Sequence, residues 1–517
     1  MKCLNTLKNL LYLIIAVGFY RKIFRYLAHK KIKNKDLLRI FWRDIMINKQ
    51  ATTGSSVVVG KQRSYGELIE FLDTNWSTTH TAEETLSRMK RLDVAFDNAS
   101  QKIDAILIGG INGKSLTVHF ASRVLREEGL QVGAFYSPHI LTYNERFCID
   151  NEVVSNKVFT ELGNDVLAAS ETLGLTPTSH ELLSIMAFLF FNAHTVDIML
   201  IEADQNGFAN TFAICTPKIN AITRINGEDV EFNEETARPA INALLSNVKP
   251  GTHVVSADQS KLNLQVMLEL VEVRGGVWDM PIRKLIPLEY PFEQLHGRCA
   301  ALAERISSIY INTFVNKGVV VVSKTLLTKL KGQRGRPTLE AKRQSELHPK
   351  RTVEQFWKEV SSSLSGRFQI LDKEKPSILL DNANNIDAFK NLLLGIRLLH
   401  YRRPLKGLTL VLGCNNTTMN QNELLKLLRY FFKKTSGSVI VCPVEKIPGH
   451  SGDASWDAEQ VTNDIKGMKI KARSAKNFKE AFEAAQKSVD ERHGLVVIAG
   501  CSSIITEYWR HKGIKKL

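Results

Sequence analysis

The sequence predicts an α/β protein in which a doubly wound sheet is followed by a second, smaller α/β unit. Three observations favour this class. Short apolar, β-branched runs alternate with helical patterns along most of the 517 residues. A glycine-rich turn at residues 109–113 joins one such run directly to a helical pattern. A second series of alternating runs begins near residue 364, and the length allows two or three domains with sizeable cores.

The glycine turn lies in the stretch Ile103–Thr117, which reads as a strand, a turn and the start of a helix. Glycines in such a turn let backbone N–H groups surround an anion, and the helix N-terminus adds partial positive charge. Lys114 would reach the outer phosphates of a nucleotide, and Ser115 carries the hydroxyl that holds Mg²⁺ in such loops. The first glycine lies one residue too close for the G-x-x-x-x-G-K-[ST] spacing. These residues alone therefore also fit a tight strand-to-helix turn with an exposed lysine.

Strands and helices alternate on both sides of this loop, as βαβ units require. Ahead of the loop, helices are expected to open at Ser64 and to cover Leu86–Leu92. After it, the sequence predicts strands at Val132–Tyr136, Asp197–Glu202, Lys218–Arg224 and His253–Ser256, and an apolar helix at Thr178–Phe191.

Polar side chains follow several of these strands at the point where each strand ends. Lys114, Ser137, Glu202 and Asp229 all occupy such positions. Ligands of doubly wound sheets bind beyond the carboxyl ends of the strands. We therefore expect the four side chains to lie along one edge of the first sheet, where they would form a site.

The distribution of charge and of cysteines indicates which partners and which compartment to expect. The formal net charge is +16, but much of the excess lies in the first 35 residues and in Lys324–Arg351. Because the basicity is local and Lys324–Arg351 has no interleaved aromatic residues, no specific nucleic-acid partner is expected. The seven cysteines are widely scattered without a C-x-x-C pair, which argues against disulfides and zinc and favours a cytoplasmic, reducing compartment.

Residues 1–60 are expected to form a basic N-terminal extension with a short apolar helix. Residues 1–35 contain no acidic residue, and Leu10–Tyr20 is a nearly pure apolar run. That run is shorter than the roughly 20 residues that span a bilayer. A docked helix, contact with a membrane surface through residues 4–35, and organelle targeting all remain open.

Three further regions follow the extension. Residues 61–323 are expected to form the first α/β domain, residues 324–363 a basic insertion or linker, and residues 364–517 the second domain. In the second domain the sequence predicts strands at Ser377–Leu380, Leu408–Leu412, Ser438–Cys442 and Leu495–Ala499, and helices at Ile386–Leu399, Asn422–Lys433 and Asn477–Val489.

Several motifs together resemble a known family. They are Ile-Asn-Gly-Lys at 111–114, Tyr-Ser-Pro-His at 136–139, Tyr-Asn-Glu-Arg-Phe at 143–147, Lys-Pro-Gly at 249–251, Ser-Gly-Arg-Phe at 365–368 and Asp-x-Ala-x-Asn at 381–385. In this order they resemble folylpolyglutamate synthase and its dihydrofolate synthase relatives, of the Mur ligase superfamily. The likeness runs from about Ser64 to about Arg510 and is strongest from Asp104 to Val154.

The resemblance implies an ATP-dependent amide ligase that adds L-glutamate to the carboxylate of a dihydro- or tetrahydrofolate through an acyl phosphate. It implies a P-loop-type, doubly wound central ATPase domain, a smaller Rossmann-like C-terminal domain, ATP and Mg²⁺ as cofactors, and a place in folate and one-carbon metabolism. The chain is expected to be a monomer. The implied catalytic residues are Lys114 and Asp229, and the implied Mg²⁺ ligands are Ser137, Glu202 and Asp229. The implied nucleotide-binding residues are Gly110, Asn112, Gly113, Lys114, Ser115, Thr117, Arg367 and Asp381.

The sequence also departs from the family pattern at several of these positions. In the loop, a threonine becomes Ile111 and a serine becomes Leu116, while a metal-binding histidine becomes Asp229. The family's carbamylated lysine falls on Leu244, and the histidine of the Asp-x-Ala-His-Asn motif is Asn384. Two alternatives therefore stand beside the folate ligase. One is a catalytically degenerate relative with a nucleotide-binding or structural role, and the other is a ligase for a different acid and amine.

Overall fold

The computed structural model describes residues 61–76, 81–203, 211–225, 233–282, 295–315, 364–414, 420–450 and 455–517. The chain divides into two units, Met1–Val59 and Gly60–Leu517, and every described residue belongs to the second. The predicted extension, the basic insertion at 324–363 and Asp229 lie outside the described residues, and the predicted domain boundaries stay a prediction. None of the described helices has the length and apolar character that crossing a membrane requires.

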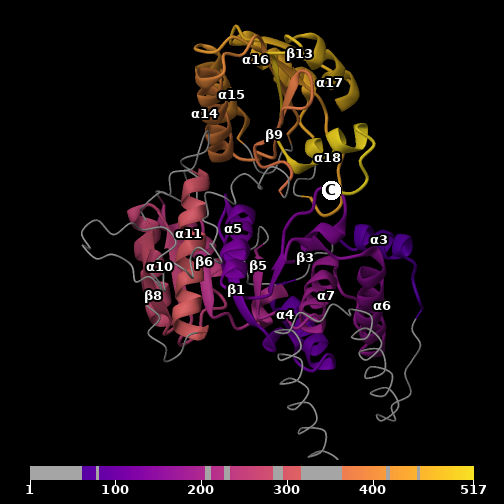
Figure 1. Ribbon diagram of the computed structural model, residues 1–517, viewed down its shortest axis with the longest axis vertical. Helices are drawn as coiled ribbons and strands as arrows, with labels where there is room; N and C mark the ends of the chain where they lie inside the picture. Colours follow the sequence, from indigo (N-terminus) through magenta and orange to yellow (C-terminus); the bar gives the residue numbers. More distant parts are fainter. Residues whose placement is uncertain are drawn as a thin grey trace, which may run out of the picture. The chain divides into compact units, whose positions relative to one another are not determined.

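The first sheet has eight strands in the order β4-β3-β2-β5-β1-β6-β7-β8 (Figure 1). All neighbouring strands are parallel except β3, which pairs antiparallel with both β2 and β4. The central strand β1 lies between β5 and β6, so the chain leaves β1 in one direction and later returns on its other side. This confirms the doubly wound α/β class. The strands are β1 Asp104–Gly109, β2 Val132–Phe135, β3 Phe147–Ile149, β4 Glu152–Val153, β5 Ile198–Glu202, β6 Ile219–Ile222, β7 His253–Ala257 and β8 Val277–Ile282.

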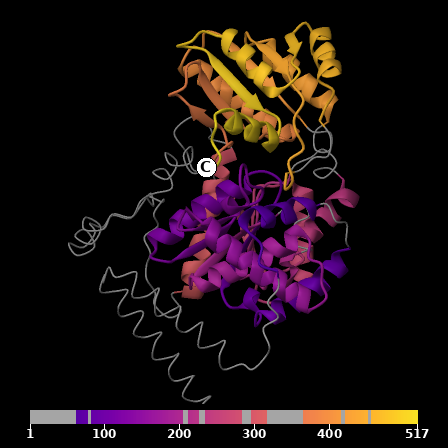
Figure 2. The ribbon, with the colours of Figure 1, turned by 90° about the vertical axis from the view of Figure 1, so that its right-hand side faces the viewer.

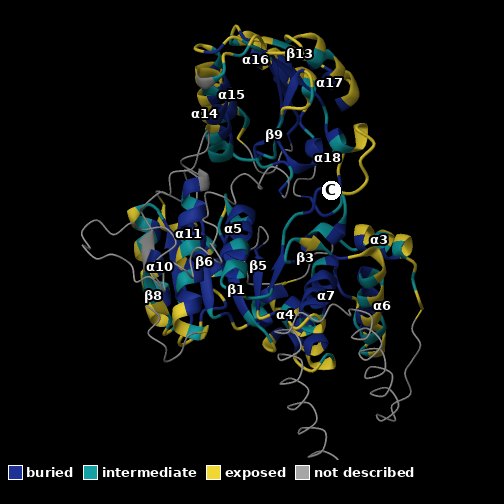
Figure 3. Cartoon of the chain, viewed as in Figure 1, coloured by how far each residue is buried: buried dark blue, intermediate teal, exposed yellow. Residues whose placement is uncertain are grey.

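Helices cover both faces of this sheet, which explains why its central strands are continuous apolar runs. Ile106 and Ile108 of β1 pack in one core with helices α5 (Lys114–Glu127) and α11 (Leu295–Tyr310). Ala105 and Leu107, at the alternate positions of β1, pack in a second core on the opposite face of the sheet. Figure 3 colours the interior of the sheet and its covering helices as buried. The helices of that second core are α3 Tyr65–Thr74, α4 Ala82–Ala95, α6 Asn156–Thr172 and α7 Ser179–Ala193.

Local sequence signals set where the helices of the second core begin. Ser64, Thr81 and Thr178 each cap a helix with the glutamate three residues later, so that α3, α4 and α7 all begin with a capping box. The glutamate of α7, Glu181, also accepts from Arg88 of α4 at 2.7 Å and is fully buried. This ion pair joins two helices of the same layer.

The remaining helices of the first sheet lie beside its later strands. Helices α9 (Glu234–Leu244) and α10 (Lys261–Val273) share an apolar cluster with Ile222 of β6 and Val254 of β7. Leu244 is buried in this cluster.

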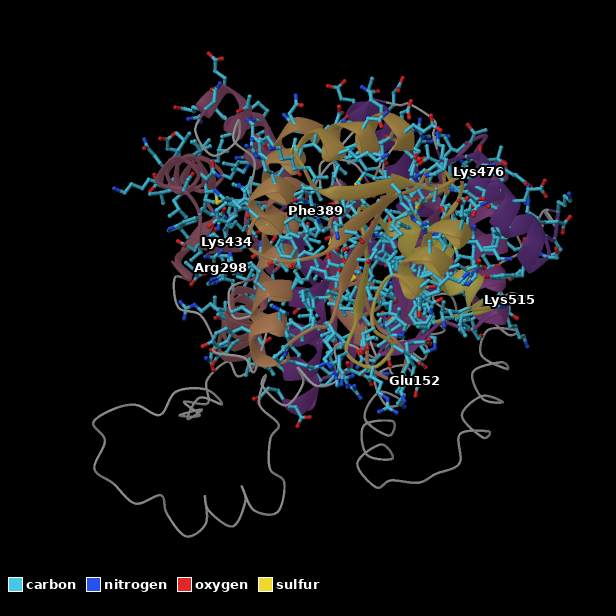
Figure 4. All side chains as sticks on the ribbon, turned by 90° about the horizontal axis from the view of Figure 1, so that it is seen from above. Glu152, Arg298, Phe389, Lys434, Lys476 and Lys515 are labelled. Atoms are coloured by element: carbon cyan, nitrogen blue, oxygen red, sulfur yellow. The ribbon has the colours of Figure 1, made fainter. Side chains whose placement is uncertain are left out.

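The second sheet has six strands in the order β13-β12-β11-β14-β10-β9, with helices on both faces (Figure 2). Only β9 runs antiparallel to its neighbour, so the predicted Rossmann-like α/β class is confirmed. Phe389 lies in its core, whereas Lys476 lies at the exposed periphery (Figure 4). The elements are β9 Gln369–Leu371, β10 Ser377–Asp381, β11 Leu408–Leu412, β12 Ser438–Val441, β13 Lys471–Ser474 and β14 Leu495–Ala499, with α14 Ile386–Arg402, α15 Gln421–Phe432, α16 Ala458–Gly467, α17 Phe478–Lys487 and α18 Ser502–His511.

Candidate functional site

A cavity of about 360 Å³ opens where the loop after β1 faces the segments around β9, β10 and α14. One part of its wall is polar and charged, and the other part is apolar. The polar lining comes from Asn112, Gly113, Lys114, Ser115, Ser137, Glu202, Arg367, Asp381, Asn382, Asn384 and Asn391. The apolar lining comes from Ile111, Leu116, Pro138, Phe368, Ala388, Leu392, Leu394 and Leu398.

The predicted phosphate loop needs its glycines for space and for backbone conformation. Gly110 has φ +119°, and a Cβ atom there would overlap Thr223 Oγ1 and lie 3.0 Å from the Thr223 carbonyl oxygen. Gly113 has φ +91° and immediately precedes α5, so the N-terminus of that helix borders the cavity. Thr117 is fully buried and donates to the Gly113 carbonyl at 2.9 Å, so it holds the loop from behind and does not line the cavity.

Lys114 folds back over its own loop. Its ammonium donates to the carbonyl oxygens of Gly110 at 3.0 Å and Ile111 at 3.2 Å. The side chain is only partly buried and lines the cavity. A positive charge is thus held at the N-terminus of α5, where an anion is also favoured by the helix dipole.

Glu202 connects the end of β5 with the first turn of α5 and the segment after β2 at the polar end of the cavity. It ends β5, and its Oε1 accepts from the Ser115 hydroxyl at 2.9 Å while Oε2 accepts from the Ser137 backbone N–H at 3.3 Å. Arg367, which precedes β9 in the second sheet, donates to the same Ser115 hydroxyl at 3.0 Å. Burial raises the pKa of Glu202, and the charges of Lys114 and Arg367 oppose that rise. The structure therefore brings together Lys114, Ser137 and Glu202, three of the four side chains expected at this edge, while Asp229 lies outside the described residues.

Asp381, the last residue of β10, lines the cavity on the side of the second sheet. Its carboxylate accepts from the backbone N–H groups of Phe368 and Ala383, both at 2.8 Å. These bonds fix the turn that presents the neighbouring Arg367. Burial of the carboxyl group raises the pKa of Asp381 to about 7, against the lowering effect of the two hydrogen bonds.

A reciprocal amide pair joins the loop after β1 to the segment before α14. Asn112 Nδ2 donates to Asn385 Oδ1 at 3.0 Å, and Asn385 Nδ2 donates back to Asn112 Oδ1 at 2.9 Å. Asn112 also donates to Asp387 at 3.1 Å, and Asn384 accepts from Asn385 at 3.1 Å. The first loop and the N-terminus of α14 are thereby joined through side chains from two predicted motifs.

The positions that depart from the family pattern have distinct surroundings. Ile111 lines the cavity and is 39% exposed, whereas Leu116, in the first turn of α5, is buried in the core and also borders the cavity. Leu244 is packed among apolar side chains and does not line the cavity. In the described part of the chain, no group of three or more histidine, cysteine and carboxylate side chains is arranged to hold a metal.

Sequence reasoning assigned no role to Arg146 and His139, which stand directly behind Ser137. Arg146 is 1% exposed, and its Nη1 donates to Ser137 Oγ at 3.2 Å. Its Nε donates to His139 Nδ1 at 3.1 Å. The Tyr-Asn-Glu-Arg-Phe motif marked the segment, but nothing in a single sequence indicates which of its side chains faces the site.

The chain is similar in sequence to known proteins along part of its length, although no family model matches it. It is 30% identical over 224 residues to the dihydrofolate synthase/folylpolyglutamate synthase of Bacillus subtilis, and the matched residues cover 42% of this chain and 49% of that protein. It is 26% identical over 208 residues to the folylpolyglutamate synthase of Lacticaseibacillus casei, 39% of this chain and 48% of that protein. The chain thus spans about half the length of the curated relatives it matches.

The similarity of structure extends further along the chain than the similarity of sequence. The folylpolyglutamate synthase of Mycobacterium tuberculosis complexed with ADP has a TM-score of 0.66 at 16% identity, covering 87% of this chain and 98% of that one. The apo form of the L. casei enzyme gives 0.63 at 18% identity, covering 87% and 100%. These identities show the fold. Together with the sequence matches, they confirm the resemblance to the folylpolyglutamate and dihydrofolate synthase family.

Proposed function

Because this chain shares the fold and the motifs of folylpolyglutamate and dihydrofolate synthases, we propose that it is an ATP-dependent amide ligase. It adds L-glutamate to the carboxylate of a dihydro- or tetrahydrofolate. One observation carries the proposal most strongly. Lys114, Glu202 and Arg367 come from three separate segments and two sheets, yet they line one end of a single cavity.

The nucleotide would place its phosphates at that charged end. The N-terminus of α5 and the Lys114 ammonium supply positive charge there, and Arg367 supplies more from the opposite wall. Phosphoryl transfer relies on positioning and on cations that neutralise developing charge, so this set of groups suits it. Among the structural neighbours, the M. tuberculosis protein was solved with ADP, and a Yersinia pestis protein with a TM-score of 0.63 at 18% identity was solved with AMPPNP and a Mn ion.

A Mg²⁺ ion fits the donor set of the same end of the cavity. Ser137 offers a hydroxyl and Glu202 a carboxylate, and Mg²⁺ prefers oxygen ligands. Glu202 is 2% exposed and its pKa is raised by burial, so a cation beside it would relieve an unfavourable buried charge. The third expected ligand, Asp229, is assigned by resemblance alone. When bound, the ion would neutralise phosphate charge during transfer.

The proposed reaction proceeds in two steps. An oxygen of the folate carboxylate attacks the γ-phosphorus of ATP, which gives an acyl phosphate and ADP. The deprotonated amino group of glutamate then attacks the acyl carbon, an amide bond forms, and inorganic phosphate leaves. Lys114 and Arg367 would hold the phosphates in line, and the cavity wall around Asn384 would face the acyl end.

The departures from the family pattern are the ground for the degenerate alternative. The family's carbamylated lysine falls on Leu244, which lies in an apolar cluster away from the cavity, so that position supplies no second anionic ligand. Asn384 lines the cavity where the family has a histidine. A nucleotide-binding protein without ligase activity would retain Lys114 and Arg367 but lose these two groups.

The proposed setting is a monomer in a reducing, cytoplasmic compartment, with no nucleic-acid partner. The six cysteines of the described residues are all buried free thiols, which fits such a compartment. Contact of residues 4–35 with a membrane surface stays a prediction.

Release of inorganic phosphate from ATP tests the proposed function. The purified chain is supplied with MgATP, L-glutamate and either tetrahydrofolate or dihydropteroate, and with each component left out in turn. We expect release only when acid and amine are both present, together with a product heavier by one glutamate residue. Nucleotide binding without any release, across folate-like and other acids, would instead establish the degenerate alternative.

A further inference from the structure

We propose that Arg146 is a positioning residue that ties the hydroxyl of Ser137 to the loop at Gly449–His450, which follows β12 of the second sheet. The inference rests on the proposed function, because it concerns the side chain expected to hold Mg²⁺. If Arg146 acts in this way, the Ser137 hydroxyl is held in position to bind Mg²⁺ only while the Gly449–His450 loop contacts Arg146.

The guanidinium of Arg146 donates hydrogen bonds in three directions. Nη1 donates to Ser137 Oγ at 3.2 Å, Nε donates to His139 Nδ1 at 3.1 Å, and Nη2 donates to the Gly449 carbonyl at 3.2 Å. Its planar face also lies 5.1 Å from the ring centre of Trp76. A rigid fork of donors fixes the relative positions of its acceptors in a way that a single ammonium cannot.

The hydrogen bond to Ser137 leaves that hydroxyl suited to a metal. A serine oxygen has two lone pairs and one proton, and Arg146 occupies one lone pair. Because Ser137 also lines the cavity wall, its other lone pair can face a cation bound there. Arginine thus orients the ligand without replacing the cation. Groups that orient metal ligands in this way typically change metal affinity by about 10–100-fold when they are removed.

The opposite end of the link is closely packed against the first domain. Gly449 has φ +82°, and a Cβ atom there would lie 2.6 Å from His139 Cε1 and 3.5 Å from Arg146 Nη2. The ring of the next residue, His450, lies 5.2 Å from the ring of His139. Because a Cβ atom at 449 would overlap the His139 ring and strain the backbone, a larger residue must displace either this loop or the His139 ring that Arg146 contacts.

The ring of His139 takes part in the same geometry. Its Nδ1 accepts from Arg146, so that nitrogen carries no proton. A second contact between the two domains stands beside it, since the Thr506 hydroxyl of α18 donates to the Ile140 carbonyl at 2.6 Å.

Replacement of Arg146 should change nucleotide affinity only when metal is present. Arg146→Lys keeps the positive charge but reaches at most part of the three acceptors. We expect it to leave the affinity for ATP in EDTA within about twofold, because Lys114 and its loop are untouched. The further gain in affinity on adding Mg²⁺ should fall by about 10-fold or more.

Two additional variants separate positioning from a general loss of structure. Gly449→Ala changes only the second sheet's loop and should reduce the Mg²⁺-dependent gain as Arg146→Lys does. In a Ser137→Ala background, Arg146→Lys should cause no further loss, because the side chain through which it acts is gone. The matched control is Arg126→Lys, the same substitution at a partly exposed ion pair with Asp150, which should keep the full gain.

The titrations are done calorimetrically on the full chain, with thermal melting of each variant alongside. A full Mg²⁺-dependent gain in Arg146→Lys, or an additive loss in the Ser137→Ala background, would overturn the inference and leave the proposed function standing. A full gain in Gly449→Ala would refute the link to the second sheet. A wild-type chain that binds no ATP under either condition would reject the proposed function and this inference together.

Discussion

Gly110 offers the sharpest test of the predicted phosphate loop, because its replacement acts through two separable effects. Its φ of +119° is a conformation that side-chain-bearing residues rarely adopt. In addition, a Cβ atom would overlap Thr223 Oγ1, which itself donates to the Gly109 carbonyl at 3.0 Å. Gly110→Ala must therefore strain the backbone and also displace the strand end that packs against the loop.

The magnitude follows from these contacts. An unfavourable φ costs about 1–3 kcal/mol, and a steric overlap in a well-packed region costs about 1–3 kcal/mol more. Gly110→Ala should therefore lower the free energy of unfolding by about 2–6 kcal/mol and should also abolish nucleotide binding, since the loop moves. Gly129 supplies the control, because it has φ +88° but a Cβ atom there would meet nothing within 4 Å. Gly129→Ala should show the backbone cost alone and keep full affinity.

Urea unfolding followed by calorimetric titration with MgATP measures both quantities. Equal destabilisation by the two alanines would show that the overlap with Thr223 has no energetic consequence. Undiminished nucleotide affinity in Gly110→Ala would refute the assignment of this turn as the phosphate loop.

Two further predictions concern the buried carboxyl groups. Glu202→Gln should lose the Mg²⁺-dependent part of nucleotide affinity while keeping or gaining thermal stability, because burial already disfavours the charged form of Glu202; a large loss of melting temperature would contradict that reasoning. The pKa of Asp381 is about 7 in the folded chain against an ordinary value of 3.8, so the folded chain binds this proton up to a higher pH than the unfolded chain does. The stability that the bound proton contributes is therefore fully present below about pH 4 and is lost as pH rises through about 7. Between pH 5 and pH 8 the free energy of unfolding of Asp381→Asn should therefore fall by about 2–3 kcal/mol less than that of wild type in urea titrations, and identical slopes would contradict the raised pKa.

The elements that sequence reasoning located best are those buried on both faces. β5, β11 and β14 are mostly apolar with every residue buried, and the sequence predicts each within one residue of its observed bounds. Strands β4 and β9 were missed because they have only two and three residues, too few to show a period. β13 was missed because it is mostly exposed and carries charged residues, as edge strands commonly do.

Some residues of the candidate site could be predicted from the sequence, and others could not. Lys114, Ser137 and Glu202 could be grouped because parallel strands bring their carboxyl ends to one edge. The role of Arg146 could not be anticipated, because its contact at Gly449 is 303 residues away in the chain. Asn385 likewise finds Asn112 across 273 residues. Contacts of this separation follow from tertiary packing, which no local pattern encodes.

The most direct measurement of the central claim is the affinity of the purified chain for MgATP in wild type, Lys114→Ala and Lys102→Ala. Lys102 is a surface lysine paired with Asp97, so its variant controls for loss of charge alone. We expect wild type and Lys102→Ala to bind MgATP alike, and Lys114→Ala to bind it about 10–150-fold more weakly, which corresponds to a charge-assisted contact of about 1.5–3 kcal/mol. Equal affinity for all three proteins would contradict the claim that the triphosphate binds beside Lys114.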